Sequence, residues 1–177
     1  MADFVFNTTA GQTIARELMI AYLNTGTGTN PVWSPVGKRV EDSSLEMDWS
    51  DETKQDILGD AYGTMKKPII TQTFDPCELD AGDAAQLSIW NKAIKDHDVQ
   101  ALCAMDMLIV HFYADSGETS ANPFAERYSS CMVKPSSIGG EGGGNLGMPI
   151  DVTYGGTRTK GTAAKDSSGA ITFTAAT

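Results

Sequence analysis

The sequence predicts a mainly β protein: an antiparallel β-sandwich or half-open barrel with one packed α-helix, in a single domain spanning residues 1–177. The first observation behind this is a series of short segments that alternate apolar and polar residues or are apolar on both faces. The second is the turns between them, in a chain with 18 glycines. Hydrophobic residues make up 41% and charged residues 20%, as in ordinary globular proteins.

The N-terminal half predicts an arm followed by strands. Residues 1–13 are polar and contain glycine, so we expect an N-terminal arm rather than core. Residues 16–23 predict a strand with apolar residues on both faces. Residues 33–40 predict another, which Pro35 places at a sheet edge or a bulge. Residues 68–74 alternate in the pattern of a half-buried strand, and 46–49 begin a shorter one.

One helix follows these strands. Asp83 is the expected N-cap, and Gln86, three residues later, completes a pair of the capping-box type. Asp96, His97 and Asp98 end the helix. The residues at helical spacing that we expect to pack on a sheet are Leu87, Trp90 and Ile94.

The C-terminal half predicts the remaining strands. Residues 101–113 form the most apolar segment, and we expect both of its faces to be covered. Residues 125–133 and 150–154 predict two more strands, and Gly155-Gly156 suggests a bulge. Residues 157–177 predict a closing C-terminal hairpin.

The net charge and the cysteine content argue against several classes of function. The net charge is −10, and only Lys38-Arg39 and Lys66-Lys67 form basic pairs, so direct nucleic-acid binding is disfavoured. From composition alone, the simplest explanation of this net negative charge is that it keeps the protein soluble. An odd number of cysteines without C-x-x-C spacing favours small buried thiols over disulfides or a zinc site. The residues concerned are Cys77, Cys103 and Cys131.

No membrane span and no signal peptide are expected. The sequence has no apolar run of 18 residues or more. Its first residues lack the basic start and apolar core of a secretory signal. We therefore expect the protein in the cytoplasm of the cell that makes it.

No enzymatic motif is found, so we predict no enzyme and no cofactor. Gly142, Gly144 and Gly147 formally match the dinucleotide fingerprint, but a strand and not a helix follows them, which indicates a loop. His97 is expected to be solvated at the helix end. His111 is expected to be a satisfied core or interface side chain rather than a base.

Residues 43–62 form the candidate functional element. This acidic segment is too long for an ordinary hairpin and carries too many apolar residues for a disordered linker. An apolar, charged loop on a β-scaffold indicates a docking arm for another protein surface. Its aromatic residues fit packing within the chain equally well. The candidate contact residues are Asp48, Trp49, Asp51, Glu52, Asp56, Ile57, Leu58 and Tyr62.

The order of these segments resembles the major tail tube proteins of long-tailed, lambda-type phages. The blocks that carry the resemblance are W-S-P-V-G-K at 33–38, V-E-D-S-S at 40–44, D-I-L-G at 56–59, K-K-P-I-I-T-Q-T-F at 66–74, G-D-A-A-Q-L at 82–87, S-S-I-G-G-E-G-G-G at 136–144 and the strand at 149–156.

The resemblance implies a virion structural protein, expressed late, whose hexameric rings stack into a hollow tail tube for DNA ejection. About four inner strands from each of six subunits, spaced ~4.8 Å and tilted ~40°, give a backbone diameter of ~50 Å, which is wide enough for a DNA duplex to pass. Residues 43–62 would reach the adjacent ring, with polar partners such as Arg16 or Arg127. The net negative charge would then repel DNA from the wall.

The resemblance also implies partners and a location. The partners are further copies of the chain, a tape-measure protein, a tail terminator and baseplate or tip proteins. The location is the virion tail, with the host cytoplasm before assembly. Three alternatives remain: a tube protein of a contractile, phage-derived particle; a monomeric β-barrel that binds a small ligand; and an enzyme that holds a metal on the loop carboxylates, although these lack EF-hand spacing.

Overall fold

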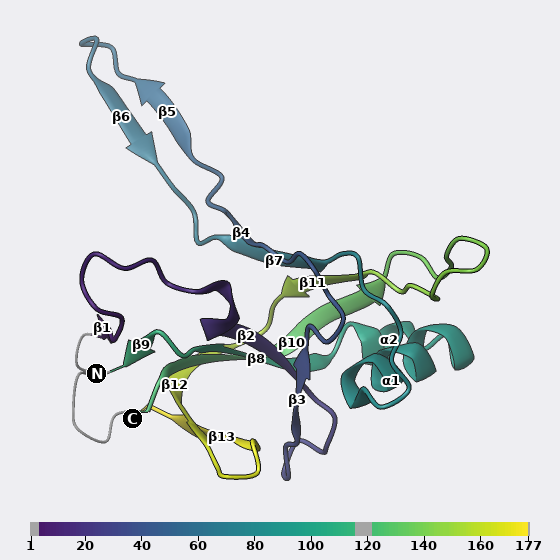
Figure 1. Cartoon of the computed structure of the whole chain (residues 1–177). Helices are drawn as coiled ribbons and strands as arrows, with labels where there is room; N and C mark the ends of the chain where they lie inside the picture. Colours follow the sequence, from purple (N-terminus) through teal and green to yellow (C-terminus); the bar gives the residue numbers. More distant parts are fainter. Residues whose placement is uncertain (1–3, 116–121, 177) are drawn as a thin grey trace.

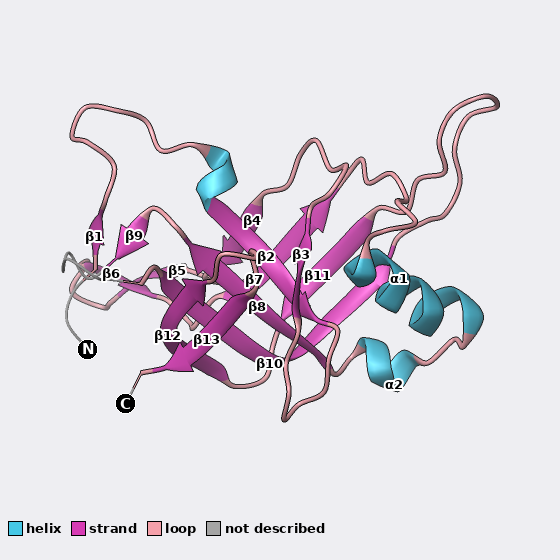
Figure 2. Ribbon diagram, turned by 60° about the horizontal axis from the view of Figure 1, so that its bottom comes forward, coloured by secondary structure: helices cyan, strands magenta, loops and turns pink. Residues whose placement is uncertain are grey.

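Two antiparallel β-sheets that share one long strand form the body of the protein (Figures 1 and 2). The structure is a computed structural model that describes residues 4–115 and 122–176. The shared strand is β10 (Phe124–Pro135). Its first half pairs with β8 (Met105–His111) and β12 (Arg158–Lys165), and its second half pairs with β11 (Ile150–Tyr154). The prediction of a mainly β, half-open antiparallel fold with a packed helix is confirmed.

The six-stranded sheet has the order β3-β2-β8-β10-β12-β13, and the four-stranded sheet has the order β10-β11-β7-β4. The strands not yet given are β2 (Met19–Asn24), β3 (Trp33–Val36), β4 (Leu45–Asp48), β7 (Ile69–Phe74) and β13 (Ile171–Ala175). Strand β3 lies at an edge of its sheet, so the prediction made from Pro35 is confirmed. A 3-10 turn (Arg16–Leu18) replaces the first residues of the strand predicted at 16–23.

Short elements complete the described chain. Strand β1 (Val5–Phe6) pairs with β9 (Ala114–Asp115). Strands β5 (Glu52–Gln55) and β6 (Ala61–Thr64) form a separate two-stranded ladder. Residues 1–3 of the predicted arm and residue 177 of the predicted hairpin lie outside the described residues.

Strand β10 changes sheets at a bend that two glycines make room for. The pairing of β10 with β8 shifts register between Tyr128 and Cys131. A Cβ at Gly155 would lie 2.7 Å from the Ser130 carbonyl oxygen, and one at Gly156, whose φ is +72°, would lie 2.7 Å from the Ser130 Cβ. The irregularity suggested by Gly155-Gly156 therefore lies in the strand they pack against.

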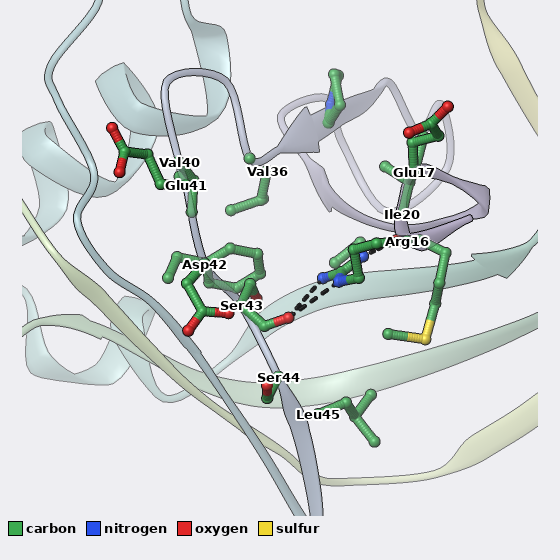
Figure 3. A pocket seen from close by; sticks show the side chains of 15 residues that line it. Arg16, Glu17, Ile20, Val36, Val40, Glu41, Asp42, Ser43, Ser44 and Leu45 are labelled. Carbon is green, nitrogen blue, oxygen red and sulfur yellow. Dashed lines mark hydrogen bonds between the residues drawn. The ribbon is translucent and has the colours of Figure 1, made fainter. Parts of the chain in front are cut away.

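The two sheets leave a gap on the side of β3 and β4, and a cavity of about 680 Å³ fills it. The connection between β3 and β4 spans this gap. Arg16 bridges it, because its Nε and Nη2 donate to the Ser43 carbonyl oxygen at 3.0 and 2.8 Å and its Nη1 donates to the Met19 carbonyl oxygen at 2.6 Å. Figure 3 shows Arg16 pointing across the cavity to Ser43.

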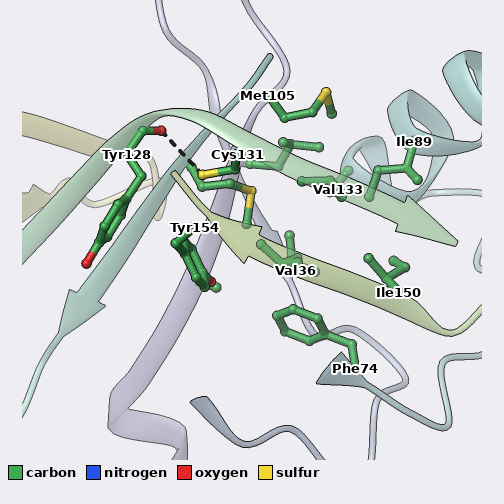
Figure 4. Packing of buried hydrophobic residues seen from close by; sticks show 14 of the residues in the cluster. Val36, Phe74, Ile89, Met105, Tyr128, Cys131, Val133, Ile150 and Tyr154 are labelled. Atoms are coloured by element: carbon green, nitrogen blue, oxygen red, sulfur yellow. Dashed lines mark hydrogen bonds between the residues drawn. The ribbon is translucent and has the colours of Figure 1, made fainter. Parts of the chain in front are cut away.

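The larger apolar cluster lies between the two sheets and the helix (Figure 4). A second cluster, including Trp33, lies on the other face of the six-stranded sheet. Strand β8 contributes side chains to both clusters. Met107 and Ile109 belong to the first cluster, and Leu108 and Val110 belong to the second. The prediction that this strand is covered on both faces is confirmed, although it begins at Met105 because α2 (Val99–Leu102) occupies the preceding residues.

Helix α1 (Ala84–Trp90) continues into a π-helical segment (Asn91–Lys95). The N-cap prediction is confirmed, since Asp83 accepts from the Gln86 backbone N–H at 2.9 Å. The Gln86 side chain does not complete a capping box; its Oε1 accepts from the Asp80 N–H at 2.7 Å.

The predicted apolar stripe of this helix is wrong at Leu87, whereas Trp90 packs against the larger apolar cluster as predicted. Ala85 and Ile89 are fully buried, whereas Leu87 is 56% exposed. Ala85 and Ile89 are four residues apart and share a face, and Leu87, midway between them, lies on the opposite one. The small side chain of Ala85 gave no signal of this role.

Two of the three cysteine predictions are confirmed. Cys77 and Cys131 are buried free thiols. Cys103 is exposed, because it follows α2 in a turn at the surface.

Close packing of β12 on β13 depends on Gly161. A Cβ there would overlap the Thr174 carbonyl oxygen and lie 2.7 Å from a Phe173 ring carbon. We predict that Gly161→Ala lowers the free energy of unfolding by about 1–3 kcal/mol in urea titrations. Gly63→Ala is the matched control, because a Cβ at Gly63 meets nothing within 4 Å. Equal stability of the two variants would contradict this packing.

Candidate functional site

Of the loop predicted at residues 43–62, residues 45–48 form β4, and the remainder from residue 49 belongs to a β-hairpin that projects from the body, which we call the arm (residues 49–68; Figure 1). It extends the ladder of β4 and β7, in which Asp48 faces Ile69. The next pair is Glu52 with Thr64, so four steps on one strand match five on the other. The segment is longer than an ordinary hairpin loop because the two-stranded ribbon continues across this irregularity, where Ser50 has φ +43°.

The tip of the arm is a hydrogen-bonded turn. Asp56 Oδ1 accepts from the backbone N–H groups of Leu58 and Asp60 at 2.8 and 3.0 Å. Gln55 Nε2 donates to the Gly59 carbonyl oxygen at 2.8 Å. Gly59 has φ +92°, a conformation that glycine adopts without strain. The acidic residue Asp56 therefore shapes the turn.

The apolar side chains of the arm point into solvent. Ile57 and Leu58, at the tip, are 103% and 82% exposed, so neither packs on the body of its own chain. Trp49 and Tyr62, closer to the base, are about half exposed, at 45% and 50%. An ordered hairpin that exposes large apolar groups is typical of a protein contact surface.

The other predicted contact residues lie at the end of β4 and along the arm. Asp48 Oδ1 accepts from the Ser50 N–H at 2.8 Å, and Glu52 pairs with Lys54 at 3.1 Å. Asp51 is exposed between them. Across residues 4–115 and 122–176, no group of three or more His, Cys, Asp or Glu side chains is arranged to hold a metal ion.

The four-stranded sheet has a polar outer face. Directly paired residues of neighbouring strands share a face. Phe74, Gln72 and Val152 point inward and are buried. The alternate residues form the outer face: Glu46, Asp48, Ile69, Thr71, Thr73, Met132, Lys134, Asp151 and Thr153.

The two arginines proposed as partners of the arm are engaged within the chain. Arg16 binds backbone carbonyl groups across the cavity described above. Arg127 forms a bidentate pair with Asp106, with N–O distances of 3.0 and 2.7 Å, and its guanidinium lies 5.6 Å from the Trp33 ring centre. Both guanidinium groups therefore have partners inside the chain.

The six-stranded sheet carries a buried polar cluster that no sequence pattern predicts. Glu126 lies 3.0 Å from His111 Nε2, accepts from the Tyr128 hydroxyl at 2.9 Å and pairs with Arg158. His111 Nδ1 lies 2.8 Å from the Tyr113 hydroxyl, so the prediction of a satisfied histidine is confirmed. The cluster joins three strands, and only the fold brings its members together.

The electrostatics of Glu126 favour its charged form. Burial raises the pKa of this carboxyl group, but hydrogen bonds from His111 and Arg158 outweigh burial and lower the pKa to about 2. Burial also raises the pKa of the Tyr128 hydroxyl. These groups stabilise the fold and lie away from the arm.

Comparisons with known proteins give similarity to solved structures only. A scan against protein-family models finds no match, and neither does a search of curated proteins. The chain is similar to a chain of the PVC sheath-tube complex of an extracellular contractile injection system in the extended state, with 10% identity and TM-score 0.47 over 86% of this chain and 94% of that chain.

Two further structures are similar to the same extent. A chain of the anti-feeding prophage cap, a tube-terminating cap, has 16% identity and TM-score 0.46 over 89% of this chain and 96% of that chain. A chain of the anti-feeding prophage baseplate has 9% identity and TM-score 0.48 over 86% and 97%. At these values the similarities assign no function to this chain. None of the helices in residues 4–115 and 122–176 has the length and apolar character that a membrane span needs.

The Glu126 cluster predicts an acid-dependent loss of stability. The folded pKa lies below the ordinary value of 4.5, so the stabilisation is complete above pH 4.5 and is lost as the pH falls towards about 2. We predict that Glu126→Gln lowers the free energy of unfolding by about 2–3 kcal/mol at pH 7, and that the difference from the unmodified protein shrinks below pH 4.5. Glu141→Gln, in an exposed loop, is the control. A pH-independent difference would contradict the charge-based explanation.

The turn at the arm tip predicts a local effect. We predict that Asp56→Ala raises the amide hydrogen-exchange rates of Leu58 and Asp60 on the order of tenfold, because their N–H groups lose the acceptor. Exchange in β8 and β10 should stay unchanged. Asp51→Ala, at an exposed position of the same arm, is the control. Unchanged exchange at the tip would show that other contacts hold the turn.

Proposed function

We propose that this protein is the structural subunit of a viral tail tube, which assembles into stacked hexameric rings that form a conduit for DNA. The observation that carries the proposal is the arm, an ordered hairpin whose tip exposes Ile57 and Leu58 away from the body. In a monomer these two apolar side chains stay in water, whereas in a stacked assembly they would be buried against the next ring. The order of sequence blocks that resembles tail tube proteins supports the same function.

The four-stranded sheet supplies the wall of the conduit. Its outer face is rich in threonine and carboxylates, so it suits a water-filled lumen. Four strands from each of six copies match the number that a lumen wide enough for duplex DNA requires. The net charge of −10 then keeps DNA from adhering to the wall. Strand β4, the free edge of this sheet, is available for pairing with a neighbouring copy.

The proposed contact residues at the end of β4 and on the arm are Asp48, Trp49, Asp51, Glu52, Asp56, Ile57, Leu58 and Tyr62. Stacking joins one end of a subunit to the opposite end of the next subunit. Such a head-to-tail contact leaves a free end at each stage, so it sets no limit to the length of the tube. A tape-measure protein, a tail terminator and baseplate or tip proteins would therefore set its length and ends. The site of action is the virion tail, reached from the host cytoplasm.

A second form of this proposal is the tube of a contractile, phage-derived particle. The subunit would be built in the same way, and an outer sheath would surround the tube. Binding of a small ligand by a monomer is the alternative that the 680 Å³ cavity favours. A protein that stays monomeric at every concentration would support that alternative.

The test removes the apolar tip without disturbing the fold. We predict that the unmodified protein, when concentrated, forms uniform hollow tubes in negative-stain electron microscopy. The double variant Ile57→Ser/Leu58→Ser should form none, with an unchanged melting temperature, because both side chains are exposed. Leu87→Ser/Val99→Ser, an exposed apolar pair on the helices, is the matched control. Normal tubes from the tip variant would refute the role of the arm.

A further inference from the structure

The two basic pairs of the chain differ in their surroundings. Lys38 Nζ and Arg39 Nε both bind Asp80, at 2.9 and 3.0 Å, so this pair is used inside the chain. Lys66 and Lys67, at the base of the arm, are exposed. Among the interactions of the described residues, none involves the ammonium group of either lysine. The base of the arm therefore presents two available positive charges.

An apolar residue stands directly beside these charges. Met65 is 73% exposed, although its long, flexible side chain is of a kind that fills irregular apolar spaces. Residues 65–67 thus combine one large apolar group with two cations. Because the chain carries a net charge of −10, any contact between copies must overcome a mutual repulsion. Cations without a partner in their own chain offset this repulsion best where they contact carboxylates of a neighbouring copy.

The cavity between β3 and β4 has the opposite character. Apolar residues that line it include Ile20, Val36 and Phe74. Three exposed carboxylates lie around it: Glu17, Glu41 and Asp42. Figure 3 shows Glu41 and Asp42 on one side of the cavity and Glu17 on the other. The one basic residue in its lining, Arg16, donates to backbone carbonyl groups.

The carboxylates of the cavity are also unused inside the chain. In the part of the chain that the structure describes, the side chains of Glu17, Glu41 and Asp42 take part in no ion pair or hydrogen bond. An apolar surface rimmed by three available negative charges is complementary to an exposed methionine followed by two available lysines. Opposite charges at a contact favour the correct register and disfavour other orientations.

We infer that residues 65–67 of one copy dock at this cavity of a second copy. Met65 lies against the apolar lining, and Lys66 and Lys67 pair with the carboxylates around it. The inference rests on the proposed self-assembly and adds to it a second contact, distinct from the arm tip. The contact joins two different surfaces, so each copy offers one of each and a ring or a stack can continue from it.

The test exchanges the charges on the two surfaces. Variant A carries Lys66→Glu/Lys67→Glu, and variant B carries Glu41→Lys/Asp42→Lys. Either change places like charges in contact, so we predict a drop in tube yield on the order of tenfold for each variant alone. In an equimolar mixture, the acidic base of A meets the basic cavity of B, and the unmodified base of B meets the acidic cavity of A. The mixture should therefore recover tubes.

Controls separate charge from fold and from the proposed function. Lys160→Glu/Lys165→Glu makes the same charge change on exposed residues of β12 and should assemble normally. Lys66→Arg/Lys67→Arg keeps the charge and should also assemble. Normal tubes from A or B alone, or a mixture that stays unassembled, would overturn the inference while leaving the proposed function intact. An unmodified protein that forms no tubes would overturn the proposed function itself.

Discussion

The sharing of β10 between two sheets is the constraint on which the rest of the structure depends. One half of this strand lies between β8 and β12, and the other half pairs with β11. The bend lies where Gly155 and Gly156 leave room beside Ser130. Because the sheets diverge there, each buries one face in the common apolar cluster. The four-stranded sheet is left with a polar outer face and with β4 at its edge, as the proposed assembly requires.

A line of polar contacts then fixes the base of the arm. The Tyr154 hydroxyl donates to Gln72 Oε1 at 2.6 Å, and Gln72 Nε2 donates to Ser43 Oγ at 2.9 Å. Arg16, in the 3-10 turn that precedes β2 of the other sheet, donates to the Ser43 carbonyl oxygen. Burial raises the pKa of the Tyr154 hydroxyl, which therefore stays protonated and remains a donor. These contacts hold β4 beside β7, and the direction of the arm follows from that ladder.

The elements that could be predicted from the sequence are those that depend on interactions between neighbouring residues. Alternation in 150–154 and the cap at Asp83 are readable from neighbouring residues, and both predictions are confirmed. The hairpin form of the arm was missed because every residue of Glu52–Gln55 is exposed and the segment has no apolar alternation. The Glu126 cluster was missed because it joins residues 15 and 32 positions away, His111 and Arg158. Such contacts depend on strand order, which no local pattern reveals.

The central claim is that copies complete one another through the arm and the polar sheet. A cryo-EM reconstruction of the assembled protein tests it most directly. The account predicts that Thr71, Thr73 and Asp151 line the lumen and that Ile57 and Leu58 are buried against the adjacent ring. Arms that stand free in solvent, or a lumen lined by the six-stranded sheet, would contradict it.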